Sequence, residues 1–434
     1  MADPAVINAS PLICACLLLF GCGGESASRV GLDDFEPFGA LPYLTGTRDA
    51  RLADELARIV EEGGTPEQLT PPDDDESLGA ALLALFPEDR FHRLVARAEE
   101  LMPPAEFRFD PVGLQHAIAF RRKHDAERLE ARKALERSPR RLGIRLVGGF
   151  AADTSGIDAV RLCVRLEAFH AAERLDEGDL DGALDAVDRM LAFAARLGAE
   201  KHLDARLHAA YLRADAMAVM QAVVTHDAAT RQHLQVLLET VQGQLQSWPD
   251  DAAAWIGERA IGLHTYEMVR DGALPALLTE EETEAFKREG DLRLIAAAAQ
   301  RHADDDQHYY LETMRRVIRA CEKPYHTRRP LFESIEDDLQ QRWGSPEYPL
   351  VAGRLLLKDL APAQALQARD RANVEAWALA LAAATGRTVP QPINPLTGTR
   401  YDVARDGGLV VISGIGAGRD ADRLRVYVPD FTQP

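Results

Sequence analysis

The stretch "DEGDLDGALDAVDRMLAFA", Asp176 to Ala194, decides the fold of this chain. Its apolar residues recur at helical spacing, and the preceding segment 157–177 has the same period. Gly178 lies between the two segments, where a tight turn between helices is needed, and Ala183 is a small residue where the helices would cross. The stretch therefore predicts a helical hairpin with helices over 157–177 and 179–197.

Four residues of this stretch, Gly178, Leu180, Ala183 and Val187, resemble the second half of a tetratricopeptide repeat. The positions that carry an aromatic residue and a glycine in the first helix of that family are not filled here. No second copy of the pattern follows at a fixed period. The resemblance therefore implies repeat-like helical hairpins in an irregular array.

Helical periodicity extends well beyond the hairpin. A first helix begins near Thr47 and ends at Gly63-Gly64, and another begins at Asp110-Pro111, an N-cap acid followed by proline at the first helical position. The second helix is charged on nearly all sides up to Arg137, which indicates an exposed helix with salt bridges. The stretch "GIRLVGGF", 143–150, predicts a strand or an extended connection. We expect further helices over 200–224, 227–246, 250–271, 281–302, 306–322, 330–343 and 363–386.

The pattern changes after Trp343, where the period shifts toward 2 and turn residues become frequent. Asp406-Gly407-Gly408 separates "TRYDVAR" from "LVVIS", which is typical of a hairpin, and "RLRVYV" predicts a third strand. The sequence thus predicts a mainly α fold: an irregular helical-hairpin array, TPR-like in part, with a small C-terminal antiparallel β module. The expected divisions are an N-terminal helical region over 47–155, a helical-hairpin domain over 156–343, and a C-terminal helix with the β module over 344–434.

A family pattern runs through Asn394-Pro395-Leu396-Thr397-Gly398, Tyr401, Asp406-Gly407 and "LVVISGIG". These residues resemble a module at the ends of secreted planctomycete-type proteins, and the C-terminal region of type II secretion pseudopilins. The resemblance covers roughly residues 370–420, and the helical body is similar to uncharacterised lipoproteins of that kind. It implies no activity. It implies no calcium site either, since the acidic turn of the family is reduced to Asp420 and Asp422.

The N-terminal stretch "PLICACLLLFGCGG", Pro11 to Gly24, has the length of a signal-peptide h-region and is too short to span a membrane. Leu19-Phe20-Gly21-Cys22 resembles the bacterial lipobox. The resemblance implies a lipoprotein signal peptide over 1–21, lipidation of Cys22, a tether over 22–46, and anchoring to a membrane of the cell envelope on the periplasmic or outer-membrane side. The residues before Pro11 depart from the pattern, because they include Asp3 and no Lys or Arg. The alternative is a cytosolic protein whose N-terminus forms a buried helix.

The formal net charge of the 434-residue chain is −19, and its acidic residues are spread along the whole length. Nucleic-acid phosphates need a basic surface, so we expect no nucleic-acid partner. Outside the leader the chain has two cysteines, Cys163 and Cys321. Each lies in a helical apolar context that favours an inert thiol, and a disulfide between them is the alternative in an exported protein.

Several patterns invite a chemical interpretation, and each also has a simpler structural one. "SGIGAG", 413–418, favours a β-turn over a dinucleotide loop, because a further strand rather than a helix is expected to follow. His264 and Glu267 lie on one helix face at the i, i+3 spacing found in half of a carboxylate-bridged metal site. Asp305 and His308 could supply the second half of such a site from another helix. Surface or capping roles are nevertheless favoured for these histidines.

Ser413 lacks the glycine that precedes the serine in a nucleophile elbow. "KPYHTRR", 323–329, could bind an anion, but it favours a helix C-terminus whose cations complement the helix dipole. The acids of "TPPDDDES", 70–77, lack the spacing of a calcium loop and lead to an N-cap at Ser77. We therefore predict no cofactor, no metal and no catalytic residue.

These observations predict an exported lipoprotein that acts as a non-catalytic scaffold for envelope proteins, because helical hairpins leave a long face free for a partner. The alternative is a hydrolase-like envelope enzyme whose site between helices is not visible as a motif. An enzyme predicts a deep pocket with acids or histidines of shifted pKa. A scaffold predicts a broad, open groove.

Overall fold

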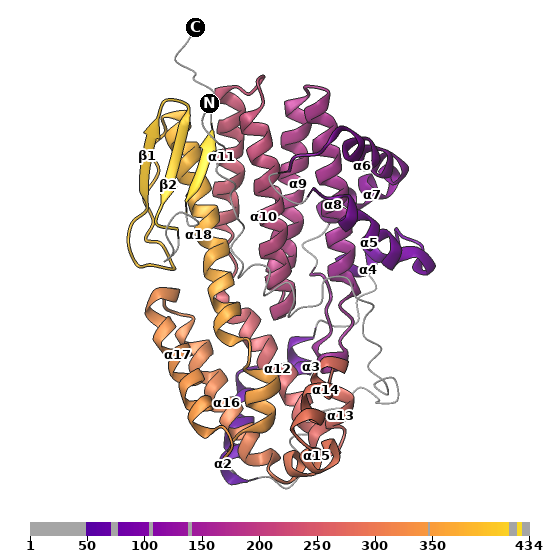
Figure 1. The fold of residues 1–434 in the computed structure, drawn as a ribbon, viewed down its shortest axis with the longest axis vertical. Helices are drawn as coiled ribbons and strands as arrows, with labels where there is room; N and C mark the ends of the chain where they lie inside the picture. The colour runs from indigo at the N-terminus through magenta and orange to yellow at the C-terminus, as the bar shows by residue number, and fades with distance from the viewer. Residues whose placement is uncertain are drawn as a thin grey trace.

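The computed structural model describes residues 49–70, 77–103, 107–137, 141–345, 348–415 and 423–427. Figure 1 shows a bundle of long helices in the upper half, a second group of long and short helices in the lower half, and a small sheet at the left edge. The expected mainly α fold with a small antiparallel β module is confirmed.

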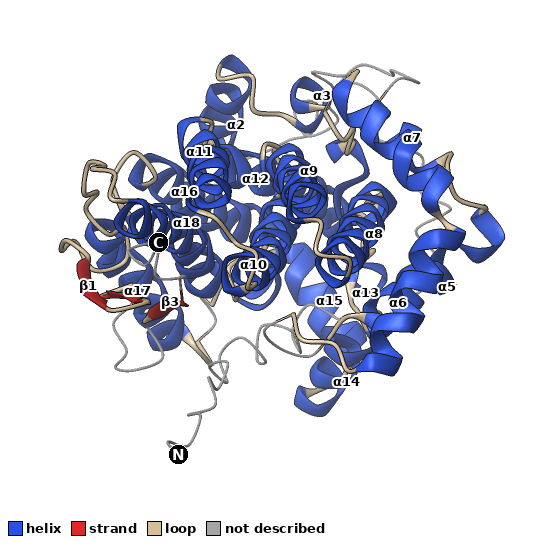
Figure 2. Ribbon diagram, turned by 90° about the horizontal axis from the view of Figure 1, so that it is seen from above, coloured by secondary structure: helices blue, strands red, loops and turns tan. Residues whose placement is uncertain are grey.

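The upper bundle consists of α8 (Ser155–Asp176), α9 (Leu180–Gly198), α10 (Leu203–Thr225), α11 (Arg231–Gln246) and the second half of α18 (Leu360–Thr385). Beside α8, on the side away from the sheet, lie α4 (Leu78–Leu83), α5 (Phe91–Leu101), α6 (Pro111–Lys123) and α7 (Asp125–Glu136), as Figure 2 shows for the last three. The lower half holds α2 (Ala50–Glu61), α3 (Pro66–Leu69), α12 (Asp251–Arg270), α13 (Leu274–Leu277), α14 (Glu280–Glu289), α15 (Leu292–Arg301), α16 (Ala303–Ala320) and α17 (Tyr325–Arg342). Short 3₁₀ segments cover Glu88–Arg90 and Leu146–Ala151, and a π-helical turn covers Ala352–Leu356.

The hairpin predicted from Asp176 to Ala194 is present as α8 and α9. Gly178 has a φ of +74°, in the left-handed region that glycine adopts without strain. Asp179 then caps α9 by accepting a hydrogen bond from the Gly182 backbone N at 3.0 Å. Ala183 is fully buried in the core that α9 shares with α8 and α10, so a small residue does lie at the predicted crossing.

Two hydrophobic cores hold the molecule together. The upper core lies among α8, α9, α10 and α11 and contains fully buried side chains such as Phe169. The lower core lies around α12 and α16, where the rings of Tyr266 and Tyr310 are 5.8 Å apart. Helix α18 joins the two, because Leu360 packs in the lower core and Leu381 in the upper one. Each fully buried side chain of this kind stabilises the fold by about 1.5–3 kcal/mol.

The β module is a three-stranded antiparallel sheet in the order β1 (Asp402–Asp406), β2 (Leu409–Ser413) and β3 (Leu424–Tyr427). Asp406 pairs with Leu409, so Gly407 and Gly408 form a two-residue turn, as predicted. Val410 and Ile412 of β2 are fully buried, and β2 packs against α18. The sheet therefore covers one side of the upper bundle.

Four expectations about secondary structure are corrected. The helix predicted from Asp110 to Arg137 is two helices, because His124 has non-helical angles (φ −114°, ψ 27°). The bend allows cations on both helices to reach acids of α8. The segment 281–302 likewise divides into α14 and α15 at Gly290. The stretch 143–150 forms mainly a 3₁₀ segment rather than a strand, and α17 begins at Tyr325, earlier than expected.

Cys22 and the whole of 1–48 lie outside the described residues, as do 71–76, Asp420 and Asp422. Cys163 is buried, Cys321 is half-buried, and both thiols are free. Burial raises the pKa of Cys321 to about 11. Among the described residues, no helix is both long enough and apolar enough to cross a membrane.

Candidate functional site

Helices α6 and α7 face α8 with arginines that bind its carboxylates. Arg121 of α6 pairs with Glu173 of α8, and the Arg128 Nη1 of α7 lies 3.3 Å from both carboxylate oxygens of Glu167. Arg132 also donates to Glu167, with Nε at 2.6 Å from Oε1. The salt bridges predicted for this segment are thus present, but Arg121 and Arg128 are buried instead of exposed. These pairs attach α6 and α7 to the bundle.

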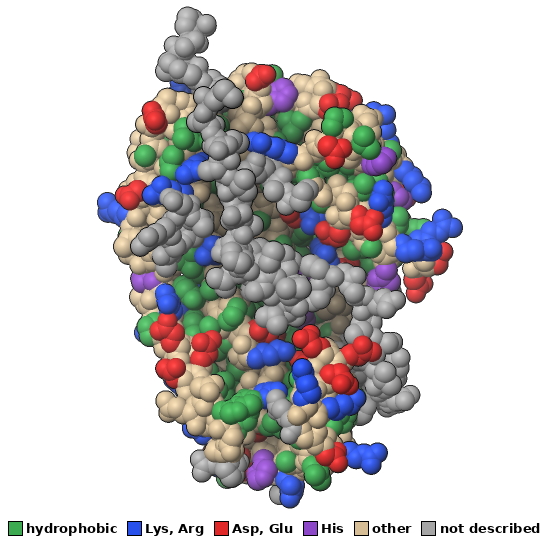
Figure 3. Space-filling view, viewed as in Figure 1, with side chains coloured by type: hydrophobic (Ala, Val, Ile, Leu, Met, Phe, Trp, Pro, Cys, Tyr) green, Lys and Arg blue, Asp and Glu red, His purple; other side chains and the backbone are tan. Residues whose placement is uncertain are grey.

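The other side of α6 lines an open hollow that it shares with α5. In α5 the side chains of Phe91, Val95 and Ala98 are buried, so Arg93 and Arg97 point away from the core. We call this depression the basic hollow; it encloses about 630 Å³ and is open to solvent. Its lining residues are Asp89, Arg90, Arg93, Leu94, Arg97, Phe120, Lys123 and His124. Figure 3 shows cationic side chains at the right-hand edge of the molecule, over α5 and α6.

The arginines of the basic hollow make only local contacts. Arg90 Nε lies 3.4 Å from Asp89 Oδ2, and Arg93 Nη2 donates to the backbone O of Asp89 at 3.1 Å. Arg97 Nη1 lies 2.8 Å from Oε2 of the exposed Glu100. Each guanidinium has five N–H donors, so most of the donor capacity faces solvent. The hollow holds four permanent cations against one lining carboxylate.

His124 is one of the residues that line the basic hollow, at the junction of α6 and α7. Its side chain is 8% exposed, and neither ring nitrogen has a hydrogen-bond partner. The nearest acid is Glu127, whose Oε1 lies 3.6 Å from Nδ1. The ring of Phe120 is 4.9 Å from the imidazole, centroid to centroid. A buried polar group without a hydrogen-bond partner is uncommon in folded proteins, and here both nitrogens are shielded from solvent by the surrounding side chains.

A second group of titratable side chains gathers around Asp204 at the start of α10. Its Oδ1 lies 3.4 Å from His208 Nε2. Burial lowers the pKa of His202 and of His208. Burial, together with the nearby charge of Asp204, raises the pKa of Glu258 on α12 to about 7. Such shifts are typical of acid–base sites, although structural networks produce them too.

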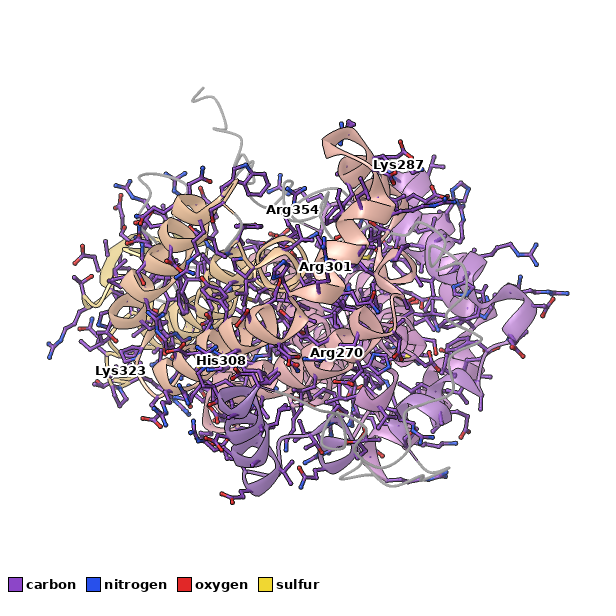
Figure 4. The ribbon with its side chains drawn as sticks, turned by 90° about the horizontal axis from the view of Figure 1, so that it is seen from below. Arg270, Lys287, Arg301, His308, Lys323 and Arg354 are labelled. Carbon is purple, nitrogen blue, oxygen red and sulfur yellow. The ribbon has the colours of Figure 1, made fainter. Side chains whose placement is uncertain are left out.

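The structure does not assemble the metal site imagined from the sequence. Glu267 binds Arg270 at 3.1 Å, and Asp305 lies 3.4 Å from Arg51. In the described ranges, no group of three or more His, Cys, Asp or Glu side chains could hold a metal ion. Figure 4 shows His308 and the cations of the lower half, with Lys323 and Lys287 toward opposite edges.

The remaining sequence candidates also have structural roles. The stretch 323–329 precedes and opens α17 and is not a helix C-terminus, so that interpretation was wrong; Arg328 is buried and binds Asp251 at 2.6 Å. Ser77 caps α4 as predicted, accepting from the Ala80 backbone N at 3.1 Å. Ser413 ends strand β2, and the next described element is another strand.

No protein-family model matches the sequence, and no curated protein or solved structure matches it.

Proposed function

We propose that the protein is an exported, lipid-anchored scaffold that binds an anionic partner at the cell envelope without catalysing a reaction. The observation that supports this function best is the basic hollow, an open depression with four cations on a chain whose net charge is −19. A local positive field on an acidic protein attracts and orients anionic partners. A second open depression, of about 520 Å³, lies between the end of α10 and the sheet, so the described surface offers broad hollows of the kind expected of a scaffold.

Anchoring rests on the lipobox-like stretch that ends at Cys22. A mature N-terminus at Cys22 with attached acyl chains would hold the helical body at a membrane, because two or more chains anchor far better than one. Mass spectrometry of the native N-terminus tests this directly. We expect an acylated cysteine, and a Cys22→Ser chain should move from the membrane fraction to the soluble fraction. An unmodified Met1 in the native protein would contradict the envelope assignment.

The binding role is tested by affinity capture from detergent-solubilised envelopes. We expect one envelope protein to co-purify with the wild-type chain and to be lost with Arg93→Ala/Arg97→Ala. The matched control is Arg329→Ala/Arg387→Ala, which removes two exposed arginines, each also paired with one acid, far from the hollow in sequence. Repeated recovery of the protein alone, or recovery of the same partner with both double variants, would count against this role.

A hydrolase-like envelope enzyme is the second candidate, and the pKa of Glu258 favours it. A carboxyl group with a pKa of about 7 can donate a proton to a leaving group at neutral pH. A panel of ester, phosphoester and peptide substrates tests the idea with wild type and Glu258→Gln. Turnover that disappears in the variant would support an enzyme, whereas no turnover by either chain would contradict it.

A further inference from the structure

We propose that the basic hollow between α5 and α6 binds a phosphate group that carries an apolar organic substituent. The proposal deepens the binding role suggested above and rests on it, but it does not depend on the lipid anchor at Cys22.

The charge of the basic hollow favours a ligand with more than one negative charge. Arg90, Arg93 and Arg97 occur at i, i+3 and i+7, so they share one side of the segment that leads into α5, and Lys123 approaches from α6. Elsewhere in the same region the buried arginines have carboxylates from other helices beside them, as Arg128 has Glu167. Within the described ranges, no ion pair joins a cation of the hollow to an acid of a neighbouring helix. A dianionic ligand would supply the negative charge that these four cations do not receive from neighbouring helices.

The donor geometry favours phosphate over a single carboxylate. A guanidinium group presents a planar fork that matches two oxygens of one phosphate, and several forks can share its oxygens. His124 lines the same hollow, but both of its ring nitrogens are buried from solvent, and Nδ1 lies 3.6 Å from Glu127 Oε1, so the ligand contacts are those of the arginines and Lys123.

The size and apolar lining of the hollow favour an organic phosphate rather than the inorganic ion. The open depression, of about 630 Å³, is larger than one phosphate group fills. Phe120 and Leu94 line it beside the cations. An aryl or acyl substituent can pack against these side chains while the phosphate meets the arginines. The same chemistry occurs in a phospholipid headgroup region and in a soluble organic phosphate.

The test uses the full chain with Cys22→Ser, so that no acyl anchor contributes to vesicle binding. Calorimetric titration with phenyl phosphate should give saturable binding, weaker for inorganic phosphate and for benzoate. Arg93→Ala/Arg97→Ala should weaken the phenyl phosphate affinity about tenfold or more, because charged hydrogen bonds are lost. Arg329→Ala/Arg387→Ala should leave it unchanged.

A vesicle arm separates the two sources of the phosphate group. Co-sedimentation with phosphatidylglycerol vesicles, but not with phosphatidylcholine vesicles, that requires Arg93 and Arg97 would identify a lipid ligand. Phenyl phosphate binding without vesicle binding would identify a soluble organic phosphate. Equal phenyl phosphate affinity in both double variants would overturn the proposal. Arg93-dependent binding of a poly-glutamate peptide in place of any phosphate would overturn it too but keep the binding role, and no anion binding at all would overturn both.

Discussion

The two sides of α6 use the same kind of residue in opposite ways. Toward α8, Arg121 is buried and meets Glu173, and Arg128 of the following helix meets Glu167. Toward α5, Lys123 joins arginines that are exposed and have only local acids. A buried charge must be paired, because an unpaired one is strongly destabilising. The comparison therefore assigns the first side to stability and the second to recognition.

Removal of a buried acid from the paired side should have the largest effect on stability. Glu167→Ala would leave Arg128 and Arg132 without their shared carboxylate, and we expect the free energy of unfolding to fall by about 3–5 kcal/mol. Urea denaturation measures this. The control is Glu130→Ala, whose exposed pair with Lys133 should contribute little to stability. Equal stability of the two variants would show that the buried pairs with Glu167 do not hold α7 on the bundle.

The pH dependence of the unfolding free energy also depends on the side of α6 and α7 that faces α8. Burial, and then the positive charges of Arg128 and Arg121, lower the pKa of His170 on α8 to about 3, from 6.5. The folded state therefore keeps this imidazole neutral, while the unfolded chain takes up a proton below pH 6.5. The associated stability is complete above pH 6.5 and is lost as the pH falls toward 3.

His170→Asn should therefore lose less unfolding free energy than the wild-type chain between pH 7 and pH 5. Urea denaturation at the two pH values gives this difference. Identical losses in both chains would mean that His170 titrates normally beside the arginines.

A small effect is expected on the recognition side when one local acid is removed. Glu100→Ala frees Arg97 from its exposed partner, and such a pair contributes little to stability. We expect unchanged urea denaturation and about twofold tighter phenyl phosphate binding, because a single exposed carboxylate at the edge of the hollow changes the affinity only slightly. Calorimetric titration measures the change, and weaker binding by this variant would place Glu100 among the groups that bind the ligand.

The sequence predicts the α8–α9 hairpin because local chemistry is decisive there: Gly178 fits the left-handed turn, Asp179 caps α9, and Ala183 fits the crossing. The same holds for the turn at Gly407-Gly408. The break at His124 could not be predicted, because charged residues on every side of that segment hide the periodicity. The burial of Arg121 and Arg128 depends on acids of α8 that are distant in the sequence.

The basic hollow was partly visible in the sequence. The i, i+3, i+7 spacing of Arg90, Arg93 and Arg97 could have marked a cationic helix face. Its meeting with Lys123 and the buried His124 depends on how α5 packs against α6, which no local pattern encodes. The cluster around Asp204 is likewise a product of tertiary packing, since Glu258 reaches it from another helix.

The most direct test of the division between the two sides of α6 is the thermal midpoint of the full chain with saturating phenyl phosphate. A ligand that binds only the folded state raises the midpoint, here by about 2 °C or more. We predict this rise for wild type and for Arg329→Ala/Arg387→Ala, and a clearly smaller rise for Arg93→Ala/Arg97→Ala at an unchanged midpoint without ligand. An equal rise in all three chains would contradict the assignment of the basic hollow to recognition.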